Sequence, residues 1–136
     1  MEKIEFSQDL LTGISEVDEQ HRELINKIND FIDGIAIYEK DRVMSKLEEL
    51  FDYMAQYASF HFSTEEGIMD KHFCPLSEIH KMQHQYFIME ANKLKFDMKT
   101  KGITPELIGK VENLLVRWVK YHISQIDMKL RDCVHK

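Results

Sequence analysis

Apolar residues recur every three or four positions along most of the chain, which is the period of an amphipathic α-helix. Alternation typical of strands is absent from the sequence. We predict helices over about residues 15–38, 41–70, 75–99 and 104–130, preceded by an arm of residues 1–14. The apolar stripes comprise Val17, Leu24, Ile25, Ile28, Phe31, Ile32 and Ile35; Val43, Leu47, Leu50, Phe51, Met54, Ala58 and Phe62; Leu76, Phe87, Ala91, Leu94 and Met98; and Ile108, Val111, Leu115, Trp118 and Val119.

Capping residues fall where these helices should begin. Ser15 and Asp18 are spaced as a capping box, Pro75 suits a first helical turn, and Thr104 is an N-cap followed by Pro105. Only 5 Gly and 2 Pro interrupt the chain, so the connections between helices are short. The sequence therefore predicts an all-α, up-down-up-down four-helix bundle forming one domain over residues 1–136.

Composition and charge exclude several classes of partner. The chain has 136 residues, 43% hydrophobic, with a net charge of −6, so it offers no basic stripe for nucleic acid or for an acidic membrane surface. It shows neither a signal peptide nor an apolar run of membrane-spanning length, and we expect a cytoplasmic monomer. The two cysteines, Cys74 and Cys133, are too few and too far apart in sequence for a disulfide framework, so we expect reduced thiols.

Polar side chains interrupt every one of the four apolar stripes. Each stands where the helical period calls for Leu or Ile, and each taken singly is better explained as a hydrogen-bonded core residue. Together they would bury five imidazoles and a carboxylate, at a cost of about 1–3 kcal/mol each if uncompensated. A bound metal would remove that cost. These residues are His21, His61, Glu65, His80, His84 and His122.

The bundle topology brings these residues to one level. In an antiparallel bundle, the beginnings of the first and third helices lie at the same end as the closing turns of the second and fourth. At a rise of about 1.5 Å per residue, His21 lies roughly 9 Å from Ser15, and His80 lies roughly 8 Å from Pro75. Scattered core histidines would agree in this way only by accident, so the sequence predicts a metal site.

The order of the motifs "DEQH", "HFSTEE", "HKMQH" and "HISQID" resembles the hemerythrin family, specifically single-domain bacterial hemerythrins. The resemblance runs from about Gly13 to Asp127. It implies two iron ions with an oxo or hydroxo bridge and no haem. It further implies that Glu65 and Asp127 bridge the irons, that one iron is held by His80, His84 and His122, and that the other is held by His21 and His61. The chain departs from the family pattern at Phe6, where Trp is expected, and at Cys74, where an aromatic residue is usual.

Asp127 would not be assigned from spacing alone. It follows His122 by five residues, which turns it about 140° away on a regular α-helix. If Asp127 is a ligand, a π-type bulge or a frayed last turn must bring it to the site.

Counting ligands on two six-coordinate irons leaves one open position, on the iron held by only two histidines. We expect O₂, or a small anion such as azide, to bind there end-on. We expect an apolar pocket wall formed by Phe62, Trp118, Val119 and Ile123, although core packing explains these residues equally well.

Three functions are compatible with such a site. The first is reversible O₂ binding by a carrier, store or delivery protein with an unidentified protein recipient. The second is an O₂ or redox sensor, which would need an output domain or partner face, and the sequence shows no second domain or long linker. The third is a diiron enzyme reducing peroxide or nitric oxide, for which the sequence offers no obvious pocket acid beyond the ligands. We expect the first, which is not enzymatic.

Overall fold

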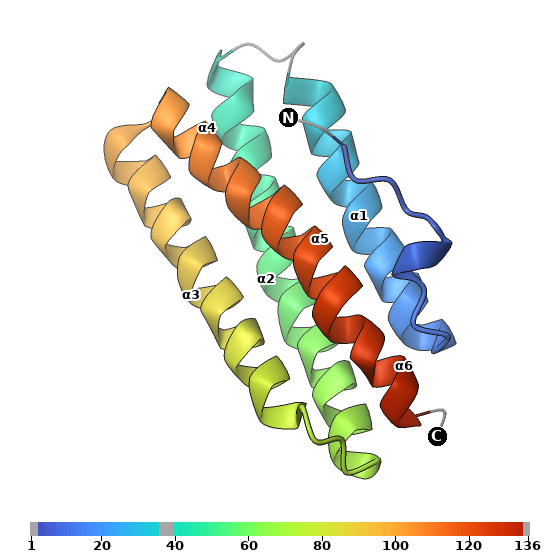
Figure 1. The fold of residues 1–136 in the computed structure, drawn as a ribbon. Helices are drawn as coiled ribbons and strands as arrows, with labels where there is room; N and C mark the ends of the chain where they lie inside the picture. Colours follow the sequence, from blue (N-terminus) through green and yellow to red (C-terminus); the bar gives the residue numbers. More distant parts are fainter. Residues whose placement is uncertain (1–2, 36–39, 135–136) are drawn as a thin grey trace.

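The predicted four-helix bundle is confirmed by a computed structural model that describes residues 3–35 and 40–134. Figure 1 shows α1 (Ser15–Ile35), α2 (Lys40–Lys71), α3 (Ser77–Lys101) and a final rod of helical segments lying side by side, with the N-terminal arm running along α1. The arm contains one short 3-10 helix, η1 (Gln8–Leu10). No strand occurs among the described residues. The predicted end of the first helix, at residue 38, lies outside them.

Hydrogen bonds join the arm to α1. The Ile4 N–H donates to Asn29 Oδ1 at 2.8 Å, and the Asn29 side-chain amide donates to the Ile4 carbonyl at 2.7 Å. Phe6, at the position of the expected Trp, packs half-buried with the Arg22 guanidinium 4.8 Å from its ring centroid. The arm is therefore fixed although it lacks the tryptophan.

The start of α1 differs from the predicted capping box. The Asp18 carboxylate accepts hydrogen bonds from the N–H and hydroxyl of Thr12, both at 2.7 Å, and from the Gly13 N–H at 3.1 Å. The bonds thus run to residues before Ser15, which Gly13 allows by adopting a φ of 80°. Asp18 ties the end of the arm to the first turn of α1.

The other boundaries follow local chemistry. Pro75 lies in a turn two residues before α3 rather than inside its first turn, and Gly102, with a φ of 75°, ends α3 by donating to the Met98 carbonyl at 2.9 Å. Thr104 caps the final rod as predicted, because its hydroxyl accepts from the Leu107 N–H at 3.1 Å.

The final rod is not a uniform α-helix. It runs through α4 (Pro105–Glu112), the π-helical η2 (Asn113–Trp118), α5 (Val119–Tyr121), the π-helical η3 (His122–Asp127) and α6 (Met128–Val134). A π-helical turn takes in one more residue than an α-helical turn, so it changes which residues face the core. Both π segments have helical structure on either side, and η3 is therefore not a frayed end.

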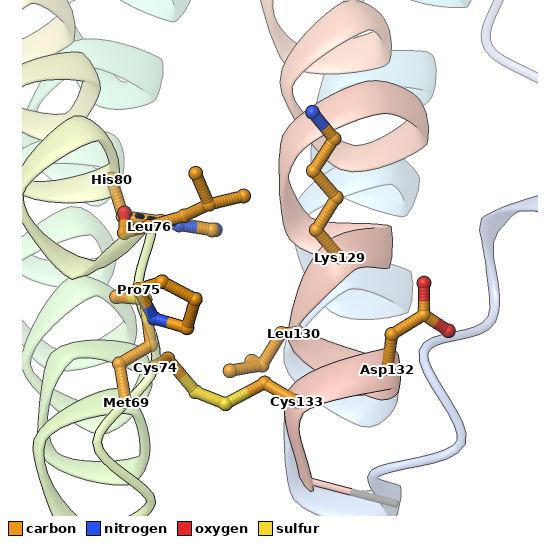
Figure 2. A pocket seen from close by; sticks show the side chains of 9 residues that line it. All are labelled: Met69, Cys74, Pro75, Leu76, His80, Lys129, Leu130, Asp132 and Cys133. Carbon is orange, nitrogen blue, oxygen red and sulfur yellow. Dashed lines mark hydrogen bonds between the residues drawn. A yellow bond between two sulfur atoms is a disulfide. The ribbon is translucent and has the colours of Figure 1, made fainter. Parts of the chain in front are cut away.

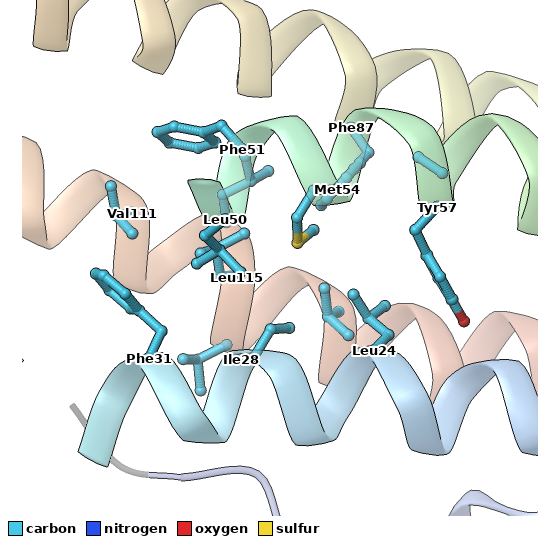
Figure 3. Close-up of a cluster of buried hydrophobic side chains, with 14 of the residues drawn as sticks. Leu24, Ile28, Phe31, Leu50, Phe51, Met54, Tyr57, Phe87, Val111 and Leu115 are labelled. Carbon is cyan, nitrogen blue, oxygen red and sulfur yellow. The ribbon is translucent and has the colours of Figure 1, made fainter. Parts of the chain in front are cut away.

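The predicted stripes form two apolar clusters along the bundle axis. The larger one contains residues of α1, α2, α3 and the final rod as far as η3, and Figure 3 shows Leu24, Ile28 and Phe31 of α1 facing residues of α2 and the final rod. The smaller one, containing Val17, Met69 and Leu130, lies at the other side of the buried histidines. The polar residues thus occupy a layer between two apolar clusters, which limits the access of water to them.

The prediction of reduced thiols is wrong. Cys74, in the turn between α2 and α3, forms a disulfide with Cys133 of α6, and their Cα atoms lie 5.7 Å apart (Figure 2). The separation of 59 residues in sequence was misleading, because the antiparallel packing brings that turn beside the last helix. A cavity of about 400 Å³ lies next to the disulfide and reaches the side chain of His80.

Within the described part of the chain, every helix is either too short or too polar to span a bilayer.

Candidate metal centre

The structure brings all seven predicted site residues together in the polar layer of the bundle. Each is at most 2% exposed. They come from every long helix: His21 from α1, His61 and Glu65 from α2, His80 and His84 from α3, and His122 and Asp127 from η3.

Six of the seven side chains form two compact groups that share both carboxylates. One group is His21, His61, Glu65 and Asp127, and the other is Glu65, His80, His122 and Asp127. In each group, one nitrogen or oxygen atom per residue can be chosen so that all of them lie within 4.8 Å of one another. Two adjacent ligand sets with two common carboxylates are the arrangement needed to hold a pair of cations.

The two oxygens of Asp127 face different groups. Its Oδ2 lies 3.0 Å from His21 Nε2, whereas its Oδ1 lies 2.9 Å from His122 Nε2 and 3.2 Å from His80 Nε2. Glu65 Oε1 lies against His61 Nε2 and 3.7 Å from His21 Nε2. The carboxylate of Asp127 is therefore oriented to reach both groups at once.

The π-helical η3 places Asp127 at the site. In a π-helix, five residues complete about one turn, so Asp127 lies next to His122 instead of on the opposite face. Of the two geometries that the sequence allows, the bulge is the one that occurs.

The imidazole rings divide into a set of two and a set of three. The His21 and His61 centroids are 4.6 Å apart, and the centroids of His80, His84 and His122 are 5.1 to 5.9 Å apart. His84 lies outside the two compact groups, but its Nε2 is buried and unpaired beside them. Burial lowers the pKa of His84, although Glu65 and Glu66 oppose the shift, so this nitrogen keeps the lone pair that a metal requires.

Hydrogen bonds to the far ring nitrogens orient three of the histidines. His61 Nδ1–H donates to Gln20 Oε1 at 2.6 Å, and His84 Nδ1–H donates to Glu66 Oε2 at 2.9 Å. His80 Nδ1–H donates to the Leu76 carbonyl at 3.3 Å (Figure 2). Such bonds fix the tautomer and leave Nε2 free to face the centre, as in ligating histidines generally.

Gln20 and Glu66 were missed by the sequence analysis. Both stand inside quoted motifs, Gln20 directly before His21 and Glu66 directly after Glu65. Each accepts a hydrogen bond from a histidine on another helix, and no spacing rule in the sequence predicts that pairing. The main chain of Gln20 is held in turn by Tyr57, whose hydroxyl donates to the main-chain carbonyl of Gln20.

Mutual electrostatic stabilisation dominates the site in the absence of a cation. Burial disfavours the imidazolium of His21, but the carboxylates of Asp127 and Glu65 outweigh burial and raise its pKa from 6.5 to about 10. The pKa of His80 is raised in the same way, against burial, chiefly by Asp127. Conversely, His122 and its neighbours hold the pKa of Asp127 well below its usual value despite complete burial. The site therefore holds protons that a cation would displace.

The unpaired polar atoms fit a metal better than a protonated core. Despite the short imidazole–carboxylate contacts, no hydrogen bond of acceptable geometry is made by either oxygen of Glu65 or of Asp127, or by the Nε2 atoms of His21, His80, His84 and His122. Buried polar groups are normally satisfied, since each one left unpaired costs about 1–3 kcal/mol. Neutral imidazole and carboxylate donors suit first-row transition metals, so the residues fit the pair of ions that the sequence resemblance implies.

A small apolar cavity of about 20 Å³ adjoins one side of the site, enough for one water-sized molecule. All four predicted wall residues line it, together with Leu24, Met54, Tyr57, Ala58 and Phe87, which the sequence did not assign. It borders both His21 and His61, but only His122 of the other three histidines. The cavity thus lies on the side of the histidine pair.

This fold and site define a helical-bundle protein with a buried histidine–carboxylate cluster that could hold metal ions. The family described as "Hemerythrin HHE cation binding domain" matches residues 12–133, and the chain belongs to the hemerythrin family.

Named relatives support this assignment. A bacteriohemerythrin of Pseudomonas aeruginosa is 30% identical over 135 residues, which are 98% of this chain and 83% of that protein. One from Clostridium acetobutylicum is 27% identical over 124 residues, 88% of this chain and 92% of that protein. A hemerythrin-like protein of Naegleria gruberi is 29% identical over 120 residues, 88% of this chain and 83% of that protein.

Proposed function

We propose that the protein binds O₂ reversibly at a non-haem diiron centre held by His21, His61, Glu65, His80, His84, His122 and Asp127. The observation that carries the proposal is the sharing of Glu65 and Asp127 between two buried ligand groups. An isolated single-metal site would not need two groups, and a satisfied polar core would not leave these carboxylate oxygens without well-aligned hydrogen bonds. Two ferrous ions in such a site would supply the two electrons with which O₂ is held and returned.

The division of the histidines supports one position for O₂. Three imidazoles on one side and two on the other would leave one coordination position open on the iron beside His21 and His61. The apolar cavity borders those two residues. We therefore assign the O₂ position to the cavity, and assign Phe62, Val119 and Ile123 to a wall that keeps bulk water away from it.

The cavity lacks a ready proton donor, which favours a carrier over an enzyme. Beyond the proposed ligands, the polar groups among its lining residues are the Tyr57 hydroxyl and the indole N–H of Trp118, which is a hydrogen-bond donor but not an acid. That hydroxyl already donates to the Gln20 carbonyl, and burial together with the charge of Glu65 raises its pKa. Reduction of bound O₂ to peroxide and its release would need protons that this wall does not deliver.

The test is an oxygenation cycle followed by absorption spectroscopy. Protein loaded with ferrous iron is exposed to air, returned to argon, and exposed again. We expect an absorption band that forms in air, disappears under argon and returns undiminished over several cycles, with about one O₂ consumed per pair of irons in the first exposure. Stoichiometric release of hydrogen peroxide on first exposure, or continued O₂ consumption with a reductant, would contradict the carrier function and favour the enzyme.

A further inference from the structure

Helix α3 has two apolar faces, of which only one packs inside the bundle. The inner face carries His80, His84, Phe87, Leu94 and Met98, all buried. The outer face carries Ile79, Met82, Tyr86, Met89 and Phe96, whose exposed fractions are 46%, 69%, 48%, 49% and 67%. Isolated exposed apolar residues are common on protein surfaces, but five large ones aligned along one face of a helix are not.

The outer residues are spaced as the seam of a coiled coil. Positions 79, 82, 86, 89, 93 and 96 alternate in steps of three and four, which is the a and d pattern of the heptad repeat. Five of these positions hold large apolar residues, and the sixth is Lys93, also exposed. We call these six residues the outer seam. A seam of this kind fits one class of partner, another helix with the same repeat.

We propose that the outer seam pairs with the outer seam of a second copy of this chain, in antiparallel orientation. The two copies would be related by a two-fold axis near the middle of the seam. Ile79 then faces Phe96 of the second copy, and Tyr86 faces Met89 of the second copy, so each residue contacts an apolar side chain or stem. Lys93 faces Met82, and its ammonium group remains at the edge, bonded to Glu90 of its own helix at 3.3 Å. A parallel pair would instead place the two Lys93 side chains in one layer.

Charges beside the seam agree with the antiparallel orientation. Glu78 and Lys99 lie at opposite ends of the seam, in the same flanking heptad position. An antiparallel pair brings Glu78 of each copy next to Lys99 of the other, whereas a parallel pair brings Glu78 next to Gln83. Opposite charges at such flanking positions set the orientation of coiled coils. The proposed dimer differs from the monomer expected from the sequence.

The exposed area is sufficient for a dimer of moderate stability. With residue areas on the order of 200 Å², the exposed fractions correspond to about 550 Å² of outer seam per copy. When flanking polar residues are included, the total surface area buried by the two copies reaches the lower end of the range of about 1,200–2,000 Å² that is typical of specific interfaces. We therefore expect a dissociation constant in the micromolar range.

Sedimentation equilibrium of the full iron-loaded chain, from micromolar to hundreds of micromolar, tests the proposal. We expect a reversible monomer–dimer equilibrium. Met82→Lys places a second cation against Lys93 in both symmetric layers, so it should raise the dissociation constant on the order of 100-fold, whereas Met82→Glu pairs with Lys93 and should leave the dimer as stable or more so. Phe60→Glu, at a 63% exposed apolar residue of α2, is the control and should change nothing.

Contrary results are equally specific. A wild-type chain that stays monomeric at hundreds of micromolar would overturn the proposal and leave a helix of another protein as the occupant. If Met82→Lys and Met82→Glu weakened the dimer equally, the antiparallel register would be excluded. Helix content and iron content measured on each variant separate a lost interface from a lost fold.

Discussion

Asp127 Oδ1 lies 2.9 Å from His122 Nε2 although the two residues are five positions apart in sequence. A regular α-helix would turn the carboxylate about 140° away, and the π-helical η3 removes that rotation. A local departure from ideal helix geometry thus supplies one of the two carboxylates that both ligand groups share. Such π turns often occur at functional sites.

Gln20 should control the metal affinity of the site without being a ligand. Gln20→Ala removes the acceptor that holds His61 Nδ1–H, so the His61 ring loses its fixed orientation. We expect iron affinity to fall about 10–100-fold, as for other groups that orient ligating histidines. Competition with a chelator measures it, and Gln56→Ala, at an exposed position of α2, is the matched control. An unchanged affinity in Gln20→Ala would show that packing alone orients His61.

Val119 should determine how long the oxygenated protein lasts. Val119→Asn introduces a polar amide into a wall that is otherwise apolar, next to the proposed O₂ position, and gives water a partner there. We expect the oxygenated protein to decay to the ferric form at least several-fold faster in stopped-flow or slow absorption traces. Val119→Ala, which keeps the wall apolar, should decay more slowly than Val119→Asn. Equal decay of both variants would assign the effect to cavity size and not to polarity.

The disulfide should stabilise the fold while contributing nothing directly to the ligand set. Joining Cys74 to Cys133 closes a loop whose ends are 59 residues apart, which in the chain-entropy account corresponds to about 4 kcal/mol. Cys133→Ser should therefore lower the free energy of unfolding of the metal-free protein by a few kcal/mol in urea titrations. Dithiothreitol should destabilise the wild type to a similar extent and leave Cys133→Ser unaffected. If the reductant destabilised the variant as much, the effect would not come from this bond.

The metal-free protein should lose stability as the pH rises from about 7 towards 10. The pKa of His21 is about 10 in the folded protein and near 6.5 in the unfolded chain, so the folded state binds the extra proton between these values. The resulting stabilisation is complete below the unfolded pKa and disappears as the pH rises through the folded pKa. Urea titrations at pH 7 and pH 9.5 measure it, and His21→Gln should reduce the dependence. A metal-free wild type whose stability rises over this interval would contradict the pairing of His21 with Asp127 and Glu65.

The fold and most of the site could be predicted from the sequence because both depend on helical periodicity. His21, His61 and Glu65, His80 and His84, and His122 each interrupt an apolar stripe, and a stripe shows which face of a helix is buried. The antiparallel topology then predicts that these residues lie at the same height along the bundle axis. Asp127 was the exception, since its position depends on η3, and only the family resemblance suggested it.

Relationships between helices could not be predicted in this way. The bond from His61 to Gln20 and the disulfide between Cys74 and Cys133 both depend on which side chains meet in three dimensions. The capping at Asp18 was misassigned for the same reason, because its partners lie in the arm and not in the helix. The hydrophobic periodicity of a helix indicates which of its residues are buried, but it does not indicate which side chains they contact.

The most direct test of the diiron proposal is a crystal structure of the iron-loaded ferric protein with azide, using anomalous scattering at the iron edge. We predict two iron peaks per chain, both bonded to Glu65 and to Asp127, with azide on the iron of His21 and His61 and inside the apolar cavity. A single iron peak, two peaks that share neither carboxylate, or azide on the iron held by His80, His84 and His122 would contradict the proposal.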